Sequence, residues 1–131
     1  MLGSNTIVGF VPSTDLKKAR HFYEGVLGLR AVSEDRFALV LDANGIAVRV
    51  ADVSSVSGFT PAPFTILGWH VPDVKKAVLG LREKGVKFER YEGMKQDALG
   101  IWTSPAGAKV AWFKDPDGNV LSGHRTSRVR R

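Results

Sequence analysis

Apolar residues in the first part of the chain change from a run typical of a strand to a spacing typical of a helix. Residues 7–11 (IVGFV) form the apolar run. After it, Ser13, Thr14 or Asp15 can cap a helix, and Gly28 suits the end of that helix. One apolar face then recurs at helical spacing: Leu16, Ala19, Phe22, Tyr23 and Val26. We expect Tyr23 to pack in the core with its hydroxyl near the surface.

Two further strands are predicted in RFALVLDANGIAVRVADV, which carries Asn44-Gly45 near its centre. An Asn-Gly pair between apolar runs is a strong signal for a β-hairpin. The second half of the chain repeats this order of elements. It predicts a strand at 64–71, a helix capped by Asp73 and ended by Gly85, a strand at 86–93, and a hairpin at 108–124.

The repetition is visible in the letters. Asp15-Leu16-Lys17-Lys18-Ala19 matches Asp73-Val74-Lys75-Lys76-Ala77, which lies 58 residues later. FALVLDANGIAVR matches VAWFKDPDGNVLS, which lies 73 residues later, so the second copy carries about fifteen extra residues. Internal repetition of this kind predicts two copies of one βαβββ unit, and therefore an α+β fold.

Asp115-Pro116-Asp117-Gly118 joins the two strands of the last predicted hairpin. Two acids at this spacing can hold a metal ion or move a proton, but the same letters are typical of a type I turn. The first copy has Asp-Ala-Asn-Gly at the matching place, with one acid only. Because both copies need a turn and only one has both carboxylates, we interpret the acids as turn-forming. We expect the first copy to make the same turn.

Composition limits the class of protein. The chain has 131 residues, 44% of them hydrophobic and 24% charged, which is ordinary for one soluble globular domain. It has no cysteine, so disulfides and thiolate chemistry are excluded. The start, MLGSNTIVGF, lacks the features of a signal peptide, and no apolar run approaches the roughly 20 residues that cross a bilayer. We expect a cytoplasmic protein with no membrane partner.

Much of the net charge of +6 comes from the C-terminus, where four arginines lie in residues 125–131 (RTSRVRR). This tail can be interpreted as a phosphate-binding arm or as a frayed polar end. No aromatic residue is interleaved with the arginines, and no nucleic-acid motif accompanies them. We favour the frayed end, which predicts a disordered basic tail at 125–131 and no nucleic-acid partner.

The paired units, with DLKKARHFYEGVLGL opening the first and FKDPDGN closing the second, resemble the vicinal oxygen chelate superfamily of glyoxalases, bleomycin-resistance proteins and extradiol dioxygenases. The resemblance covers residues 7–123, and LGIWTSPAGAKVAWFKDPDGNVLS is similar to a bacterial branch without assigned substrate. It implies a single domain at 1–124, with modules at about 6–53 and 64–124. Each module would curl a mixed β-sheet into a cup with its helix outside, and the protein would form a homodimer.

Metal-binding members of that superfamily place four ligands inside the cup, one on the first and one on the last strand of each module. The matching positions here are Val8, Arg49, Ile66 and Ser122. Such metals take histidine nitrogen or carboxylate oxygen, and an arginine brings positive charge to the place of the cation. We therefore expect no cofactor. A divalent metal held by His70 and His124, which fall where they can face the cup near its rim, is the less favoured alternative.

Alternation along the strands assigns Arg49 to the cup. On the strand 46–51, Arg49 would face the cup between Ala47 and Ala51. The alternate residues would pack under the helix: Ile46, Val48 and Val50. A guanidinium between two alanines is a site for an anion. The sequence leaves open the alternative that Arg49 pairs with an acid of its own chain or of a dimer partner.

Pairing across the turn at 115–118 sets Trp112 opposite Ser122, so that Trp112 lines the cup while Phe113 and Leu121 enter the core. Trp112 filling a collapsed cup is the alternative. On the first strand, Val8 and Phe10 face one side. The residues predicted to line a ligand site are Val8, Phe10, Arg49, Ile66, His70, Trp112, Ser122 and His124.

The predicted pocket therefore has apolar walls, a flat aromatic surface, a guanidinium, a hydroxyl and two imidazoles. We interpret the protein as glyoxalase/bleomycin-resistance-like, and expect it to bind a small, partly aromatic or anionic molecule without a metal. One alternative is an enzyme of the vicinal oxygen chelate type, a lyase, isomerase or dioxygenase, with relocated or absent metal ligands. Another is an interaction module whose cup is filled. The departure from the ligand pattern argues against glyoxalase or dioxygenase activity and leaves enzymatic activity undecided.

Overall fold

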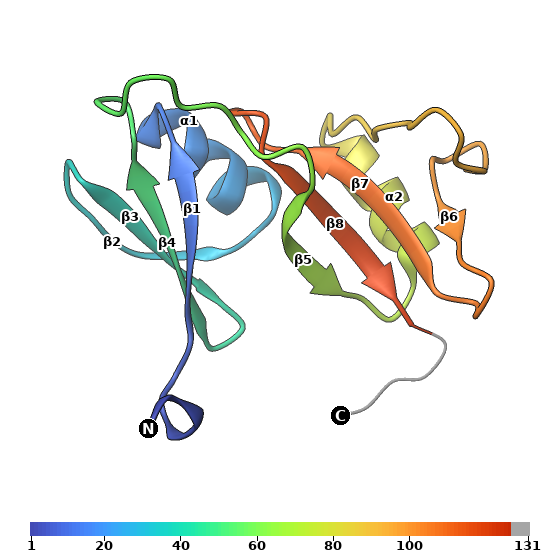
Figure 1. Ribbon diagram of the computed structural model, residues 1–131, viewed down its shortest axis with the longest axis horizontal. Helices are drawn as coiled ribbons and strands as arrows, with labels where there is room; N and C mark the ends of the chain where they lie inside the picture. Colours follow the sequence, from blue (N-terminus) through green and yellow to red (C-terminus); the bar gives the residue numbers. More distant parts are fainter. Residues whose placement is uncertain (127–131) are drawn as a thin grey trace. The chain divides into compact units, whose positions relative to one another are not determined.

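The structure is a computed structural model that describes residues 1–126. The chain divides into two compact units, Met1–Pro61 and Ala62–Arg131, each built around one four-stranded mixed sheet (Figure 1). This arrangement confirms the predicted α+β fold of two modules. Within the described part of the chain, no helix has both the length and the apolar character needed to cross a membrane.

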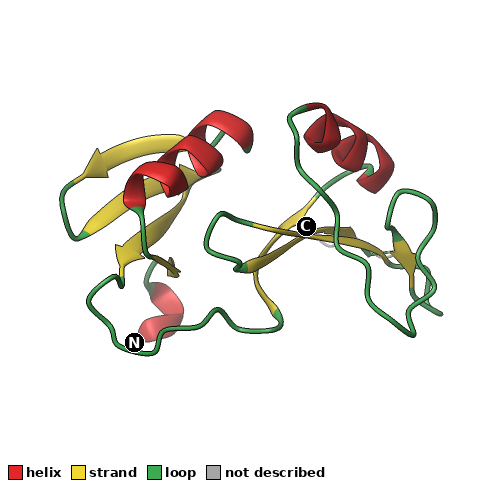
Figure 2. Cartoon of the chain, turned by 90° about the horizontal axis from the view of Figure 1, so that it is seen from above, coloured by secondary structure: helices red, strands yellow, loops and turns green. Residues whose placement is uncertain are grey.

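The first unit has strand order β1-β4-β3-β2, with β1 parallel to β4 and the other pairs antiparallel. Its elements are η1 (Leu2–Ser4), β1 (Val8–Ser13), α1 (Leu16–Arg20), η2 (His21–Val26), β2 (Arg30–Glu34), β3 (Ala38–Ala43) and β4 (Ile46–Asp52). The apolar pattern does not indicate β2, because this strand is mostly polar and exposed. Figure 2 shows the helical segment α1–η2 on one side of its sheet.

The helix of the first unit begins and ends at the predicted residues but changes its winding on the way. The carboxylate of Asp15 caps it by accepting from the amides of Lys17 and Lys18 at 3.1 and 3.2 Å. From His21 the helix widens to π geometry, and the amide of Leu27 donates to the carbonyl of Phe22. The winding places Tyr23 at 0% exposure. The prediction of a hydroxyl near the surface is therefore wrong.

The second unit repeats this design with strand order β5-β8-β7-β6, and β5 is parallel to β8. Its elements are β5 (Thr65–His70), α2 (Val74–Glu83), β6 (Trp102–Thr103), β7 (Lys109–Lys114) and β8 (Val120–Arg125). Asp73 caps α2 by accepting from the amide of Lys76. The apolar face of α2 packs on the sheet in a core formed by Val74, Val78, Ile101 and Ala111. Arg125 belongs to β8, and the rest of the predicted basic tail, from residue 127, lies outside the described residues.

The strand predicted at 86–93 is not formed. Only an isolated bridge joins Phe88 to Phe113, and the edge strand is the later β6. The side chain of Gln96 bonds to the backbone of this segment. Its amide nitrogen donates to the carbonyls of Glu89 and Gly100 at 2.9 and 2.8 Å, and its oxygen accepts from the amide of Tyr91 at 2.8 Å. The amide of Glu89 also donates to the carbonyl of Trp112 at 2.8 Å, so the segment follows β7 without forming a continuous strand.

The two hairpin turns differ, which corrects the expectation that both modules make the same turn. In the second unit the loop runs from Asp115 to Asn119, and the amide of Gly118 donates to the carbonyl of Asp115 at 3.0 Å. In the first unit Ala43 pairs directly with Ile46. Asn44 and Gly45 have φ of 51° and 93°, as a two-residue type I′ turn requires. The shorter loop shifts the register between the two repeats by one residue.

Candidate functional site

The face of the second sheet turned away from α2 collects four of the eight predicted ligand-binding residues. Trp112 lies directly opposite Ser122, as predicted, and His70 lies beside His124. Directly paired residues project on the same side of a sheet. Phe113 and Leu121 project on the other side, where they are 2% and 0% exposed. Their predicted place in the core is confirmed.

Three aromatic rings lie together around Trp112, and we call Tyr91, Trp102 and Trp112 the aromatic cluster. The ring centroids of Tyr91 and Trp112 are 5.5 Å apart at nearly a right angle, and those of Trp102 and Trp112 are 6.2 Å apart. Burial raises the pKa of the Tyr91 phenol, and the nearby Glu89 carboxylate raises it further. The cluster therefore keeps a neutral phenol beside two indoles at neutral pH. Sequence reasoning missed Tyr91 and Trp102.

A small polar group lies next to the cluster on β5 and β8. The hydroxyl of Ser122, which is 4% exposed, is 3.5 Å from Nδ1 of His124. The rings of His124 and His70 meet edge to face with centroids 5.9 Å apart. Burial lowers the pKa of His124, and repulsion from His70 lowers it further. A neutral imidazole can both accept and donate a hydrogen bond, so these two histidines can bind either a donor or an acceptor group of a ligand.

Gly68 makes room for this polar group. A Cβ atom at position 68 would lie 2.8 Å from the Ser122 hydroxyl and 3.1 Å from Cε1 of His124. Both distances are shorter than ordinary van der Waals contacts, so a larger residue would displace one of the two side chains. Two residues earlier, the register of β5 shifts between Thr65 and Leu67, which leaves Ile66 outside the ladder in a bulge.

We predict that His124 titrates below the ordinary imidazole value of about 6.5. His70→Asn should raise its pKa part of the way, because it removes the repulsion and leaves the burial. Since the unfolded chain binds this proton more readily, the stabilising contribution of neutral His124 is complete above about pH 6.5. It is lost progressively as the pH falls toward the lower pKa of the folded state.

NMR titration of the imidazole signals and denaturant melts at several pH values measure both effects. The stability slope below about pH 6.5 should be shallower in His124→Asn, which has no proton to gain. A His124 pKa at or above the ordinary value would contradict the prediction.

On the first sheet, Arg49 lies beside Phe10 and opposite Val40, and Val8 lies beside Ala47. Val48 and Val50 are buried on the helix side as predicted, but Ile46, also predicted to pack there, is exposed at the start of β4. Phe10 is 65% exposed and Val8 46%. Arg49 is half-buried and forms no ion pair with any residue between 1 and 126.

The pKa of the Asp35 carboxyl lies below its usual value. The amides of Phe37 and Ala38 donate to this carboxylate and are the main cause, and the charge of Arg49 makes a smaller contribution. The charge of Arg49 therefore acts on the Asp35 carboxylate from a distance, without a direct ion pair between the two side chains.

The predicted site residues thus fall into two groups on separate sheets. Val8, Phe10 and Arg49 share the first sheet, while His70, Trp112, Ser122 and His124 share the second. The four positions matched to a metal site hold two alkyl groups, a cation and a hydroxyl, with Ile66 in a bulge. This donor set does not fit a divalent ion. Across residues 1–126, no three His, Cys, Asp or Glu side chains gather as ligands could.

The sequence matches the family model of the Glyoxalase/Bleomycin resistance protein/Dioxygenase superfamily over residues 5–122. No curated protein sequence matches the chain. The fold resembles a member of this superfamily from Sphaerobacter thermophilus DSM 20745, with 22% identity and a TM-score of 0.75, covering 95% of this chain and 99% of the other.

Two further solved structures are similar. TnmS3, an antibiotic binding protein from Streptomyces sp. CB03234, has 25% identity and a TM-score of 0.71, covering 95% of this chain and 97% of the other. A lactoylglutathione lyase from Agrobacterium tumefaciens has 16% identity and a TM-score of 0.71, covering 93% of each chain. The likeness to the lyase shows a shared fold alone.

Proposed function

The chain belongs to the Glyoxalase/Bleomycin resistance protein/Dioxygenase superfamily, and on that premise we propose that it binds a small, partly aromatic or anionic molecule without a metal ion. The binding surface is the face of the second sheet that carries the aromatic cluster. The observation that supports this proposal is the packing of Tyr91, Trp102 and Trp112 beside the Ser122–His124 pair.

Aromatic side chains suit this role for a physical reason. Flat rings bury a large apolar area, and they prefer partner rings in offset or edge-to-face contact. Trp112 is half-buried, so part of its surface remains open to a ligand ring. The adjacent imidazoles and hydroxyl can then orient the polar groups of the ligand. TnmS3, an antibiotic binding protein with 25% identity to this chain, supports binding as the kind of function.

Isothermal titration calorimetry with 2-naphthoate and its neutral carboxamide tests the proposal. Both share a fused ring system, so both should bind through the aromatic cluster, and NMR shifts should be largest at Trp102, Trp112 and His124. Saturable binding with these shifts supports the proposal. Binding of neither compound, or shifts confined to other residues, would count against an aromatic site on this face.

We predict that protein purified without an affinity tag contains far less than one transition-metal ion per chain. The reason is the donor set at the four family positions, where alkyl groups and a guanidinium offer a divalent ion no ligands. Elemental mass spectrometry gives the metal content directly. About one zinc, nickel, iron or manganese per chain that is lost in Arg49→Ala/Ser122→Ala would refute the prediction. A metal lost in His70→Asn/His124→Asn would support the relocated-ligand alternative instead.

Arg49 is proposed as the anchor for an anionic group on the first sheet. This site on the first sheet is separate from the aromatic cluster, and NMR shifts of Phe10 and Arg49 follow binding of 2-naphthoate to it. Arg49→Ala should weaken that binding by about tenfold, the lower end for a lost hydrogen bond to a charged group, because the exposed Phe10 leaves this face accessible to water. Binding of the neutral carboxamide should not change. Arg49→Lys should recover only part of the affinity, since an ammonium lacks the planar fork.

A structural Arg49 would behave differently in the same two measurements. It would leave 2-naphthoate affinity unchanged and lower the melting temperature of Arg49→Ala. Arg36→Ala is the matched control, because Arg36 lies in the same unit over the ring of Phe37 and is absent from the proposed site.

A further inference from the structure

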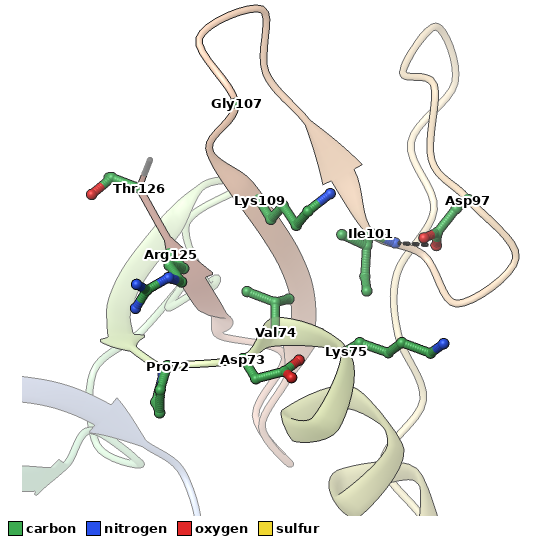
Figure 3. Close-up of a pocket in the computed structure, with 10 residues that line it drawn as sticks. All are labelled: Pro72, Asp73, Val74, Lys75, Asp97, Ile101, Gly107, Lys109, Arg125 and Thr126. Atoms are coloured by element: carbon green, nitrogen blue, oxygen red, sulfur yellow. Dashed lines mark hydrogen bonds between the residues drawn. The ribbon is translucent and has the colours of Figure 1, made fainter. Parts of the chain in front are cut away.

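A cavity of about 370 Å³ lies in the second unit at the start of α2 (Figure 3). Its walls come from four stretches of chain: the start of α2, the segment before β6, the start of β7 and the end of β8. Val74 and Ile101 line it and also belong to the core between α2 and the sheet. The cavity is therefore on the helix side of the sheet, and the aromatic cluster does not line it.

Two cations line this cavity from neighbouring strands. Lys109 of β7 lies directly opposite Arg125 of β8, so their side chains leave the same face of the sheet. Figure 3 shows both above the start of α2. Both side chains are exposed, and the ammonium of Lys109 and the guanidinium of Arg125 point toward opposite sides of the cavity in Figure 3. Lys75, from the first turn of α2, is a third cation in the lining.

None of these cations has an acidic partner among residues 1–126. The ammonium of Lys109 donates to the hydroxyl of Thr103 at 3.0 Å, which leaves its charge uncompensated. Cations without acidic partners that come from α2, β7 and β8 around one cavity are the feature that would attract an anion.

The two acids in the lining are engaged with the backbone. Asp73 accepts from the amide of Lys76 as the cap of α2. Asp97 accepts from the amides of Leu99 and Ile101, both at 2.9 Å. Because the negative charge of the Asp73 carboxylate lies at the N-terminus of α2, that helix end is not the feature that attracts an anion here. The features that attract it are the cations of β7 and β8, Lys109 and Arg125.

From these contacts we infer that the cavity binds a small molecule with one carboxylate or phosphate group and an aliphatic body. The anionic group lies near Arg125 and Lys109, the cations that β8 and β7 contribute to the lining. The aliphatic body lies against Pro72, Val74 and Ile101. The volume falls within the range of small-molecule sites. This site is separate from the aromatic face, and the inference does not depend on the function proposed for that face.

The test uses the full chain, labelled with ¹⁵N, in buffer free of phosphate, with hexanoate and hexyl phosphate as probes. Saturable amide shifts should appear at Val74, Ile101, Lys109 and Arg125. Arg125→Gln and Lys109→Gln should each weaken binding by about tenfold. Lys87→Gln removes one exposed charge from the same unit outside the cavity, and it should leave the affinity unchanged. Hexanol, which has the same aliphatic body without the charge, should bind more weakly than hexanoate.

Thermal melts separate an anion site from a structural role for Arg125. Without a probe, Arg125→Gln should not lower the melting temperature, because the exposed guanidinium has no ion pair among residues 1–126. Hexanoate should raise the melting temperature of the wild-type chain but not that of Arg125→Gln. A structural arginine predicts a lower melting temperature in the variant, with or without hexanoate, and that result would overturn the inference.

Three other results would overturn it. They are the absence of saturable shifts at the cavity, an effect of Lys87→Gln equal to that of Arg125→Gln, and an equal response to sodium chloride at matched ionic strength. The last two would show diffuse attraction to a basic surface. Trp112→Ala should leave hexanoate affinity unchanged, so that failure of the aromatic site and failure of this one are told apart.

Discussion

Asp115→Ala should lower the free energy of unfolding by about 3 kcal/mol, although this acid belongs to a segment that could equally bind a metal or move a proton. Asp115 is 6% exposed. Its carboxylate accepts from the amides of Asp117 and Asn119 and from the side-chain amide of Asn119, each at 2.9 Å. Asn119 is itself buried, so alanine would strand two of its donors away from water. Each stranded donor costs about 1–3 kcal/mol.

Asp42→Ala is the matched control, since Asp42 is the repeat equivalent of Asp115, 73 residues earlier. Its side chain has only a long ion pair of 3.9 Å with the exposed Arg30, so its loss should cost less than about 1 kcal/mol. Urea unfolding of both variants supplies the comparison. Equal losses, or a wild-type stability for Asp115→Ala, would show that the carboxylate does not hold the turn together.

Trp112→Ala should weaken binding of 2-naphthoate by about 2 kcal/mol or more, which is roughly thirtyfold. Trp112 is the ring that contacts both other members of the aromatic cluster, so its loss removes the centre of the surface. Trp112→Phe should keep part of the affinity, because a smaller ring still offers a flat face. Calorimetry on the three proteins measures the series.

Phe64→Ala is the control for Trp112, because Phe64 is an exposed aromatic residue of the same unit just before β5. It should bind the ligand as the wild type does. If Trp112 only fills space, Trp112→Ala would melt at a lower temperature and retain its affinity. That combination would remove the aromatic face from consideration as a binding site.

Local signals in the sequence predicted the elements that local chemistry controls. Asp15 and Asp73 cap their helices, and glycines with positive φ follow both, as only short-range geometry is needed. Alternation likewise placed Trp112 opposite Ser122 and Phe113 in the core, because period-two geometry follows once the turn between the strands is counted. The resemblance to the family rested on the repetition of these signals and on the quoted motifs, and the family model over residues 5–122 confirms it.

The candidate site was predictable only in part. Trp112, Ser122, His70 and His124 share one face as alternation along the strands requires. Tyr91 and Trp102 were not identified, because one lies in a loop and the other in a strand of two residues, too short for a pattern. The bulge at Ile66 escaped detection as well, since an extra residue leaves no mark in a run of apolar letters.

What the sequence by itself determined was therefore the local geometry: helix caps, the presence of both hairpins, the alternation of faces and the repeat. Tertiary structure alone decided which distant residues meet. Gln96 bonds to the backbone of Glu89, Tyr91 and Gly100 in the segment where the predicted strand is not formed. Packing also buries the whole of Tyr23, hydroxyl included, and gathers Tyr91 and Trp102 around Trp112. Each of these depends on contacts through space, which propensity and spacing along the chain do not encode.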